Sequence, residues 1–192
     1  MSDPLSAAGA HLREHFAGCE PDVASVTFLG VERMDVLRFS TAAGHCYVTL
    51  GCSRHPMTEA SAAAVDPVRG PRAEVVMTLR AGVPTTGLAR SLAVIAATPA
   101  VEGIVLTDDL LVDLSAPLWE GAPFTAVLLG RSEIPDVELD APRSPVRFLA
   151  AVPITQTEAA WVRLKGADAM RQAWADDGVD VTDPGRRAVA PG

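Results

Sequence analysis

The sequence predicts a single α/β domain of the α+β type, in which short strands and amphipathic helices share one core. Three observations support this class. Stretches rich in β-branched and aromatic residues recur along the chain, and turn residues separate them. Segments with helical spacing of apolar residues lie before, between and after these stretches. A chain of 192 residues is also long enough to bury one core without disulfides or a structural metal.

The first third of the chain predicts one helix and an antiparallel meander. Apolar residues at helical spacing favour a helix over residues 5–16, with Asp3 and Pro4 suited to its cap and first turn. Turn residues then separate three β-rich segments, which are residues 23–29, 35–40 and 45–50.

The middle of the chain begins with a polar connection over residues 58–72, part of which, residues 59–64, has helical composition. A strand is predicted at residues 73–79. A helix is predicted over residues 88–97, and Pro99 marks its expected end. Strand signals then resume at residues 104–107, 110–114 and 124–129.

The segment at residues 146–166 predicts a strand that feeds a helix. Its apolar run ends at Pro153, and Thr155 with Glu158 three residues later forms a capping box. Gly166 suits the end of that helix, and a second short helix is expected at residues 168–176.

The C-terminal residues are expected to be peripheral. From Asp180 onward the sequence has little to bury and is expected to fray. We therefore expect a domain over residues 1–183 and a flexible tail over residues 184–192.

Composition restricts the function classes. The formal charge is −8, and apart from the pair Arg186–Arg187 the basic residues are spread singly, so a nucleic-acid ligand is not expected. No apolar run approaches the ~20 residues that span a bilayer, and the N-terminus lacks a signal-peptide pattern. Three cysteines, an odd number, agree with a reducing compartment, so the prediction is a cytoplasmic protein. An acidic surface suits a basic protein partner.

One sequence pattern suggests a metal-dependent hydrolase. Residues 11–15 read H-x-x-E-H, which on a helix places His11 and His15 on one face for zinc and leaves Glu14 as base. Such a site needs a further distal carboxylate ligand, and the pattern arises easily in a His-containing amphipathic helix. A solvated helix face is therefore the preferred interpretation, and the hydrolase is the alternative.

The loop over residues 51–57 offers weaker chemistry. Cys46, Cys52 and His55 are spaced C-x5-C-x2-H, which is not a spacing of structural zinc sites. Ser53 lies two residues before His55 but lacks the G-x-S-x-G elbow of a nucleophilic serine. We find no coherent catalytic set in the sequence and expect no cofactor.

Two features are candidates for partner binding. The loop over residues 133–140 carries the densest acidic patch of the chain, formed by Glu133, Asp136, Glu138 and Asp140, and should be exposed and mobile. Trp119, beside Gly121, is either an exposed binding aromatic or, as we prefer, a plug at the edge of the core.

Four motifs taken together resemble one family. Residues 49–57, 72–79, 124–129 and 152–158 resemble, in order and spacing, the bacterial suppressor-of-fused domain proteins, and the resemblance covers about residues 10–187. It implies a curved, mixed and largely antiparallel sheet flanked by helices, without known catalytic residues.

The resemblance also implies a function. In animals the related protein has two domains and sequesters a zinc-finger transcription factor of the Hedgehog pathway by pairing with an extended peptide. This chain corresponds to the N-terminal domain alone, so peptide clamping between two domains does not carry over. Bacterial members are proposed to be immunity proteins. The expectation is therefore a non-catalytic protein-binding domain, and in particular an immunity protein that neutralises a basic toxin by direct binding.

Overall fold

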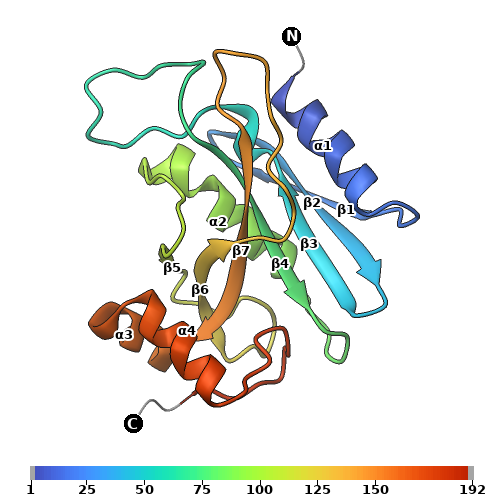
Figure 1. Cartoon of the computed structure of the whole chain (residues 1–192), viewed down its shortest axis with the longest axis vertical. Coiled ribbons are helices and arrows are strands. Elements are labelled where there is room, and N and C mark those ends of the chain that lie inside the picture. The colour runs from blue at the N-terminus through green and yellow to red at the C-terminus, as the bar shows by residue number, and fades with distance from the viewer. Residues whose placement is uncertain (1–2, 190–192) are drawn as a thin grey trace.

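The structure, a computed structural model, describes residues 3–189 (Figure 1). Its seven strands form one open sheet in the order β1-β2-β3-β4-β7-β6-β5. The strands are β1 (Asp22–Phe28), β2 (Val31–Thr41), β3 (Gly44–Leu50), β4 (Arg72–Leu79), β5 (Leu111–Asp113), β6 (Phe124–Arg131) and β7 (Val146–Thr155). The helices are α1 (Pro4–His15), α2 (Leu88–Glu102), α3 (Gln156–Lys165) and α4 (Ala167–Asp176), with a 3-10 turn η1 (Cys52–Arg54).

Neighbouring strands are antiparallel except for β4 and β7, which are parallel. The predicted α+β class with a mixed, largely antiparallel sheet is therefore confirmed, as are the meander and the helix near the N-terminus. Gly44 closes the β2–β3 hairpin with φ +142°, and a Cβ there would lie 2.2 Å from the carbonyl oxygen of Leu79. Glycine is required at this turn because no larger residue fits.

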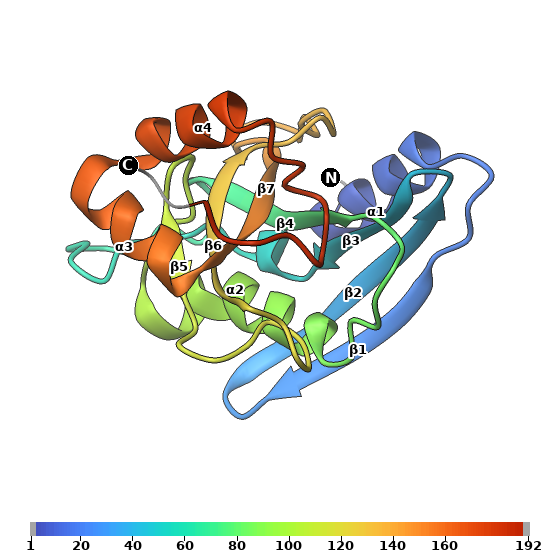
Figure 2. The same cartoon turned by 90° about the horizontal axis from the view of Figure 1, so that it is seen from below.

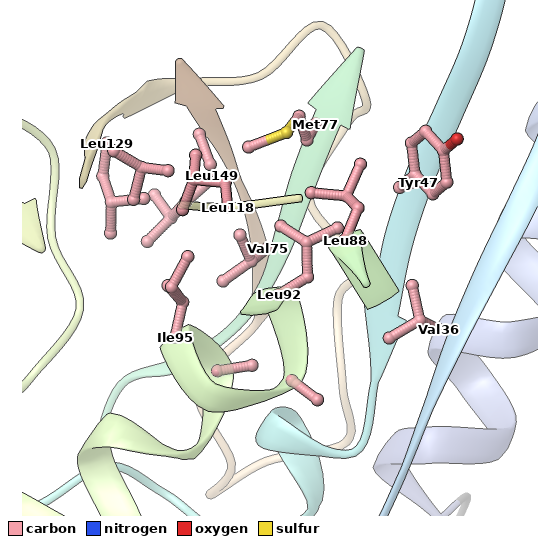
Figure 3. Close-up of a cluster of buried hydrophobic side chains, with 14 of the residues drawn as sticks. Val36, Tyr47, Val75, Met77, Leu88, Leu92, Ile95, Leu118, Leu129 and Leu149 are labelled. Carbon is pink, nitrogen blue, oxygen red and sulfur yellow. The ribbon is translucent and has the colours of Figure 1, made fainter. Parts of the chain in front are cut away.

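One face of the sheet packs against α2. Leu88, Leu92 and Ile95 are fully buried and project from the helix toward the sheet (Figure 3). They meet Val75 of β4 and Leu149 of β7, whose side chains alternate with residues that face the other way. This contact forms the largest apolar cluster of the domain.

The opposite face is covered at its two ends by different helices. Figure 2 shows α2 on one side of the sheet and α1 and α4 on the other. Leu12 of α1 packs over Phe39 and Phe148, while Met170 of α4 packs over Ile154, near the C-terminal end of β7. No helix within residues 3–189 covers the strip of sheet between these two clusters.

The sheet forks between β4 and β7. Their pairing runs from Arg72 with Val146 to Val76 with Ala150 and then ends, although both strands continue. Beyond this point β4 stays paired with β3, and β7 stays paired with β6. In Figure 1 the two strands diverge toward the lower edge of the molecule.

This fork explains how β7 continues past Pro153, where its apolar run ends, to Thr155. Proline lacks an N–H and normally interrupts a strand ladder. At Pro153, beyond the last β4–β7 pair, the missing N–H costs no bond to β4.

The capping box at the start of α3 is confirmed. The Thr155 hydroxyl accepts a hydrogen bond from the Glu158 N–H at 3.2 Å, and the Glu158 carboxylate accepts one from the Thr155 N–H at 2.9 Å. The N–H groups of Thr155 and Glu158 at this helix end are therefore satisfied by local residues.

Two expected elements are absent. Residues 59–64 form turns and not a helix, because this short, exposed alanine-rich piece has no apolar face to bury. Residues 104–107 are not a strand: the N–H of Leu106 contacts the Met57 sulfur at 3.4 Å and takes no part in a ladder.

The expected end of α2 at Pro99 is also wrong, since the helix continues to Glu102. Gly103 then ends it in the left-handed conformation, with its N–H bonded to the Pro99 carbonyl. Burial of Ala96 and Ala97 against the core outweighs the cost of one interior proline.

The C-terminal segment is more integrated than expected. Arg186 is 7% exposed and Val189 is 5% exposed, so the expectation that residues after Asp180 have little to bury is wrong for these two. The boundary between residues 183 and 184, and the flexibility of the tail, stay predictions.

We predict that Thr155→Ala lowers the free energy of unfolding by about 1 kcal/mol, because the Glu158 N–H loses its acceptor. Urea denaturation followed by circular dichroism measures this, with Thr157→Ala, an exposed position two residues further on, as control. Partner binding by the folded fraction should persist, and its loss in fully folded protein would show that this turn is a binding site.

Candidate functional site

The acidic loop, residues 133–140, lies between β6 and β7 and is anchored at two points. Ile134, a residue of the loop itself, is buried, and the main chains of Val137 and Val146 exchange two hydrogen bonds of 2.9 Å. Its four carboxylates are all exposed, and they belong to Glu133, Asp136, Glu138 and Asp140. The loop thus presents negative charge from a fixed base.

One basic residue at the edge of this loop is already engaged. Arg147 donates to Asp108 at 2.9 Å and lies 4.0 Å from Asp136. Both contacts are partly exposed, so they contribute little to stability. Neither contact involves Glu133, which has no ion pair among the described residues.

A cleft of about 440 Å³ opens beside the acidic loop, over the fork between β4 and β7. Its floor is the helix-free strip of the sheet, and the side chains there are small or apolar: Cys46, Val76, Thr78, Ala150 and Val152. A volume of this size is typical of ligand-binding clefts.

The walls of the cleft come from segments far apart in sequence. His15 and Phe16, at the end of α1, form one wall, and Val181 and Thr182 of the C-terminal segment form another. Arg131 and Glu133 complete the rim. Only Glu133 of the predicted partner-binding residues lines the cleft, so the acidic loop and the cleft form one continuous surface.

Trp119 does not belong to this surface. It is 3% exposed and its ring lies 5.5 Å from that of Phe124, in the core cluster on the α2 face of the sheet. The preferred interpretation as a core residue is confirmed. The alternative of an exposed binding aromatic is wrong for this structure, because almost none of the side chain is accessible.

The H-x-x-E-H residues lie on α1, and both imidazoles pack on aromatic rings. The His11 ring stacks on Phe148 at 5.8 Å, and the His15 ring meets the edge of Phe16 at 4.8 Å. Within residues 3–189 no group of three or more His, Cys, Asp or Glu side chains is arranged to hold a metal ion. The hydrolase alternative therefore has no ligand set here.

The loop at residues 51–57 is structural. The His55 imidazole is exposed and lies 2.9 Å from Glu32, and the Ser53 hydroxyl donates to Glu74 at 2.6 Å. Burial and the nearby charge of Glu74 raise the pKa of the Cys52 thiol well above its usual range. Cys52 is thus held as an unreactive thiol.

Sequence reasoning missed Glu74 of β4, whose carboxylate holds this loop by hydrogen bonds. Its carboxylate is fully buried and accepts hydrogen bonds from the Thr49 hydroxyl, the Gly51 N–H, and the N–H and hydroxyl of Ser53. Burial raises the pKa of Glu74, and these hydrogen bonds oppose that rise. A single carboxylate inside the apolar strand at residues 73–79 was the available signal.

A second buried carboxylate, Glu158, was recognised only as a local cap. It also accepts hydrogen bonds from the Trp174 indole at 3.1 Å and from both Nη atoms of Arg186, at 2.7 and 3.0 Å. Burial alone would raise the pKa of Glu158, but the hydrogen bonds from Arg186, Thr155 and Trp174 lower it below its ordinary value.

Arg186 is itself enclosed. Its guanidinium lies over the rings of Phe124, at 5.0 Å, and Trp174, at 5.5 Å, and donates to the Pro153 carbonyl at 2.7 Å. The Glu158–Arg186 pair therefore binds the C-terminal segment to the turn between β7 and α3.

None of the helices within residues 3–189 has both the length and the apolar character needed to cross a bilayer.

Comparison with known proteins identifies the fold. The family described as suppressor of fused protein (SUFU) matches residues 30–187 by its sequence model. No curated protein matches the chain in sequence.

Three solved structures are similar over nearly all of this chain. A SUFU homolog from Neisseria gonorrhoeae FA 1090 is 16% identical, with a TM-score of 0.73, and the match covers 99% of this chain and 98% of that one. The structure of the Sufu–Fu complex is 14% identical, with a TM-score of 0.67 and coverages of 97% and 92%. Drosophila Suppressor of Fused is 15% identical, with a TM-score of 0.67, and the match covers 97% of this chain but 51% of that protein.

We predict that Arg186→Met destabilises the domain by about 3–5 kcal/mol at neutral pH, because it leaves the buried Glu158 carboxylate without its cationic partner. Urea denaturation at pH 7 measures this. Arg187→Met, at the exposed neighbouring position, should change little. Equal effects of the two variants would contradict the assignment.

The Glu158–Arg186 pair also predicts that the free energy of unfolding depends on pH in the acidic range. Since the pKa of Glu158 is lowered in the folded state, its contribution to stability is present above the ordinary glutamate pKa of about 4.3 and is lost as the pH falls through the folded value. The difference in unfolding free energy between wild type and Arg186→Met should therefore shrink between pH 7 and pH 3. A pH-independent difference would refute this linkage.

For Glu74 we predict the opposite dependence of stability on pH. Because its pKa is raised in the folded state, its contribution to stability is greatest at acidic pH and falls as the pH rises through the folded value. Glu74→Gln should remove this component while keeping the fold. Glu74→Ala should cost about 3 kcal/mol or more, since several buried donors lose their acceptor. Urea denaturation of both variants from pH 4 to pH 8 tests this.

Proposed function

The chain belongs to the suppressor of fused protein family, whose sequence model matches residues 30–187, and on that basis we propose that it is a non-catalytic domain that binds another protein. The fold is shared with a chain of a solved Sufu–Fu complex, which supports a binding role. The groups that the sequence suggested as catalytic also serve packing or structural hydrogen bonds here. His11 and His15 pack on aromatic rings, and Ser53 holds Glu74.

The observation that carries the proposal is the acidic loop beside the cleft. Four exposed carboxylates on an anchored segment, in a chain of formal charge −8, form a surface that attracts a basic partner. Charges of this kind accelerate encounter and select among partners more than they add affinity. The proposed contact residues are Glu133, Asp136, Glu138 and Asp140.

We further propose that the partner is a basic toxin domain and that this chain is its cytoplasmic immunity protein. An acidic protein that covers a basic surface by direct binding can occlude a nuclease or a similar catalytic domain. The bacterial members of the family with which the sequence shares its motifs are proposed to have this role.

The loop variant tests the binding surface. We predict that the fourfold variant Glu133→Gln, Asp136→Asn, Glu138→Gln and Asp140→Asn slows association with the partner about tenfold or more at low ionic strength, and much less at high salt. The partner is identified by co-expressing this chain with the product of any toxin gene adjacent to its own gene. Association of the two purified proteins is then followed by surface plasmon resonance.

A matched control removes the same charge elsewhere. Glu20→Gln, Glu102→Gln, Glu120→Gln and Asp177→Asn are all exposed positions outside the loop and should leave association near the wild-type rate. Equal slowing by both variants would assign the effect to net charge and refute the loop as the contact surface. Failure of the wild-type chain to protect cells against every neighbouring toxin candidate would refute the immunity role.

A further inference from the structure

The fork leaves one edge of β4 without a neighbouring strand. After Val76 no strand in the described part of the chain pairs with β4 on the side of β7, while β3 continues to pair with it as far as Leu79. An unpaired strand edge presents main-chain donors and acceptors that can bind another extended segment.

The direction of these groups follows from two hydrogen bonds. The Val75 N–H donates to the Thr49 side chain and so points toward β3, whereas the Arg80 N–H donates to the Thr182 carbonyl, on the opposite side. Main-chain groups alternate sides along a strand. The N–H and carbonyl of Thr78 therefore point into the fork, in the same direction as the Arg80 N–H.

The C-terminal segment forms hydrogen bonds with both strands of this fork. Thr182 accepts from the Arg80 N–H at 2.8 Å on the β4 side, and Arg186 donates to the Pro153 carbonyl at 2.7 Å on the β7 side. In Figure 1 this dark red segment passes between the diverging ends of the two strands. The wide end of the fork is thus closed by the chain itself, and the cleft is the part that stays open.

The open part suits a peptide. Its floor consists of small side chains at Ala150 and Val152 and the exposed Thr78, so a main chain can approach the edge of β4 closely. Its volume of about 440 Å³ accommodates a short extended segment rather than a folded element.

The rim determines which side chains fit. Glu133 and Arg131 both line the cleft, and neither has an ion pair among residues 3–189. Glu133 continues into three further exposed carboxylates of the acidic loop, so the local charge is negative. A cationic segment is favoured on this side.

We propose that the cleft binds an extended peptide segment of the partner, which pairs its main chain with the β7-facing edge of β4 at Thr78. Small apolar side chains of the segment lie over Ala150 and Val152, and a lysine or arginine reaches Glu133. The proposal rests on the protein-binding function above and specifies the chemistry of the part that enters this site.

The probe is a synthetic peptide with the sequence acetyl-Lys-Val-Ala-Val-Lys-amide, titrated into isotope-labelled full-length protein and followed by NMR. The same peptide with glutamate in place of lysine is the control. The lysine peptide should shift the resonances of Thr78, Ala150 and Val152. At ten times its Kd it should slow hydrogen exchange at the Thr78 amide about tenfold. Unchanged exchange at Thr78 with saturating peptide, or no binding at all, overturns the proposal.

Two variants locate the site. Thr78→Phe fills the cleft from an exposed strand position and should weaken binding of the lysine peptide at least about tenfold, a difference readily resolved in Kd. Thr27→Phe, the same change at an exposed position of β1, should leave it unchanged and controls for added surface apolarity. Equal affinity of the two variants overturns the cleft as the site.

The charge assignment has its own test. Glu133→Gln should weaken the lysine peptide about two- to fivefold, while Arg131→Gln should strengthen it or leave it unchanged. Weakening by Arg131→Gln, or no effect of Glu133→Gln, overturns the cationic specificity.

Different results would refute the peptide site and the protein-binding function. If the native partner binds Thr78→Phe and wild type equally well, the cleft is not its site, although the domain still binds a protein. If the lysine peptide behaves as expected and no protein partner binds the chain, the peptide site stands and the protein-binding function falls.

Discussion

The buried pair of Glu158 and Arg186 is the interaction on which the C-terminal half of the domain depends. Glu158 accepts hydrogen bonds from Thr155 at the end of β7, from Trp174 of α4 and from Arg186 and Val189 of the terminal segment. Three segments therefore meet at one carboxylate of α3. A buried ion pair of this kind contributes little net stability by itself, but losing either partner is costly. It fixes the arrangement of these segments.

Glu74 has the corresponding role in the other half, without a cation. Its carboxylate gathers the strand end at Thr49 and the turn at Gly51 and Ser53, while the neighbouring Arg72 donates to the carbonyls of Ser53 and Arg54. Each buried carboxylate thus supports a connection between elements. This distribution agrees with a domain whose function lies on its surface.

The fork links this scaffold to the proposed binding surface. β7 leaves β4 after Ala150 in order to deliver α3 and α4 to the sheet, and the Glu158–Arg186 pair holds the diverging strand in place. The consequence is an unpaired edge at Thr78 beneath a cleft whose rim includes Glu133. Structural matches at 14–16% identity establish the fold, and it is this local geometry that supports a specific mode of binding.

The sequence by itself determined the elements with local signals: the meander, the N-terminal helix and the capping box of Thr155 with Glu158. Their signals are periodicity and caps within a few residues. The four motifs also identified the family correctly. Among the candidate site residues, the exposure of the acidic loop was predictable because its carboxylates and proline favour solvent. Only the tertiary structure decided that β7 passes Pro153, that Arg186 reaches Glu158, and that Glu133 alone of the predicted contacts borders a cleft. These outcomes depend on partners distant in sequence, whose packing and hydrogen bonds override local preference.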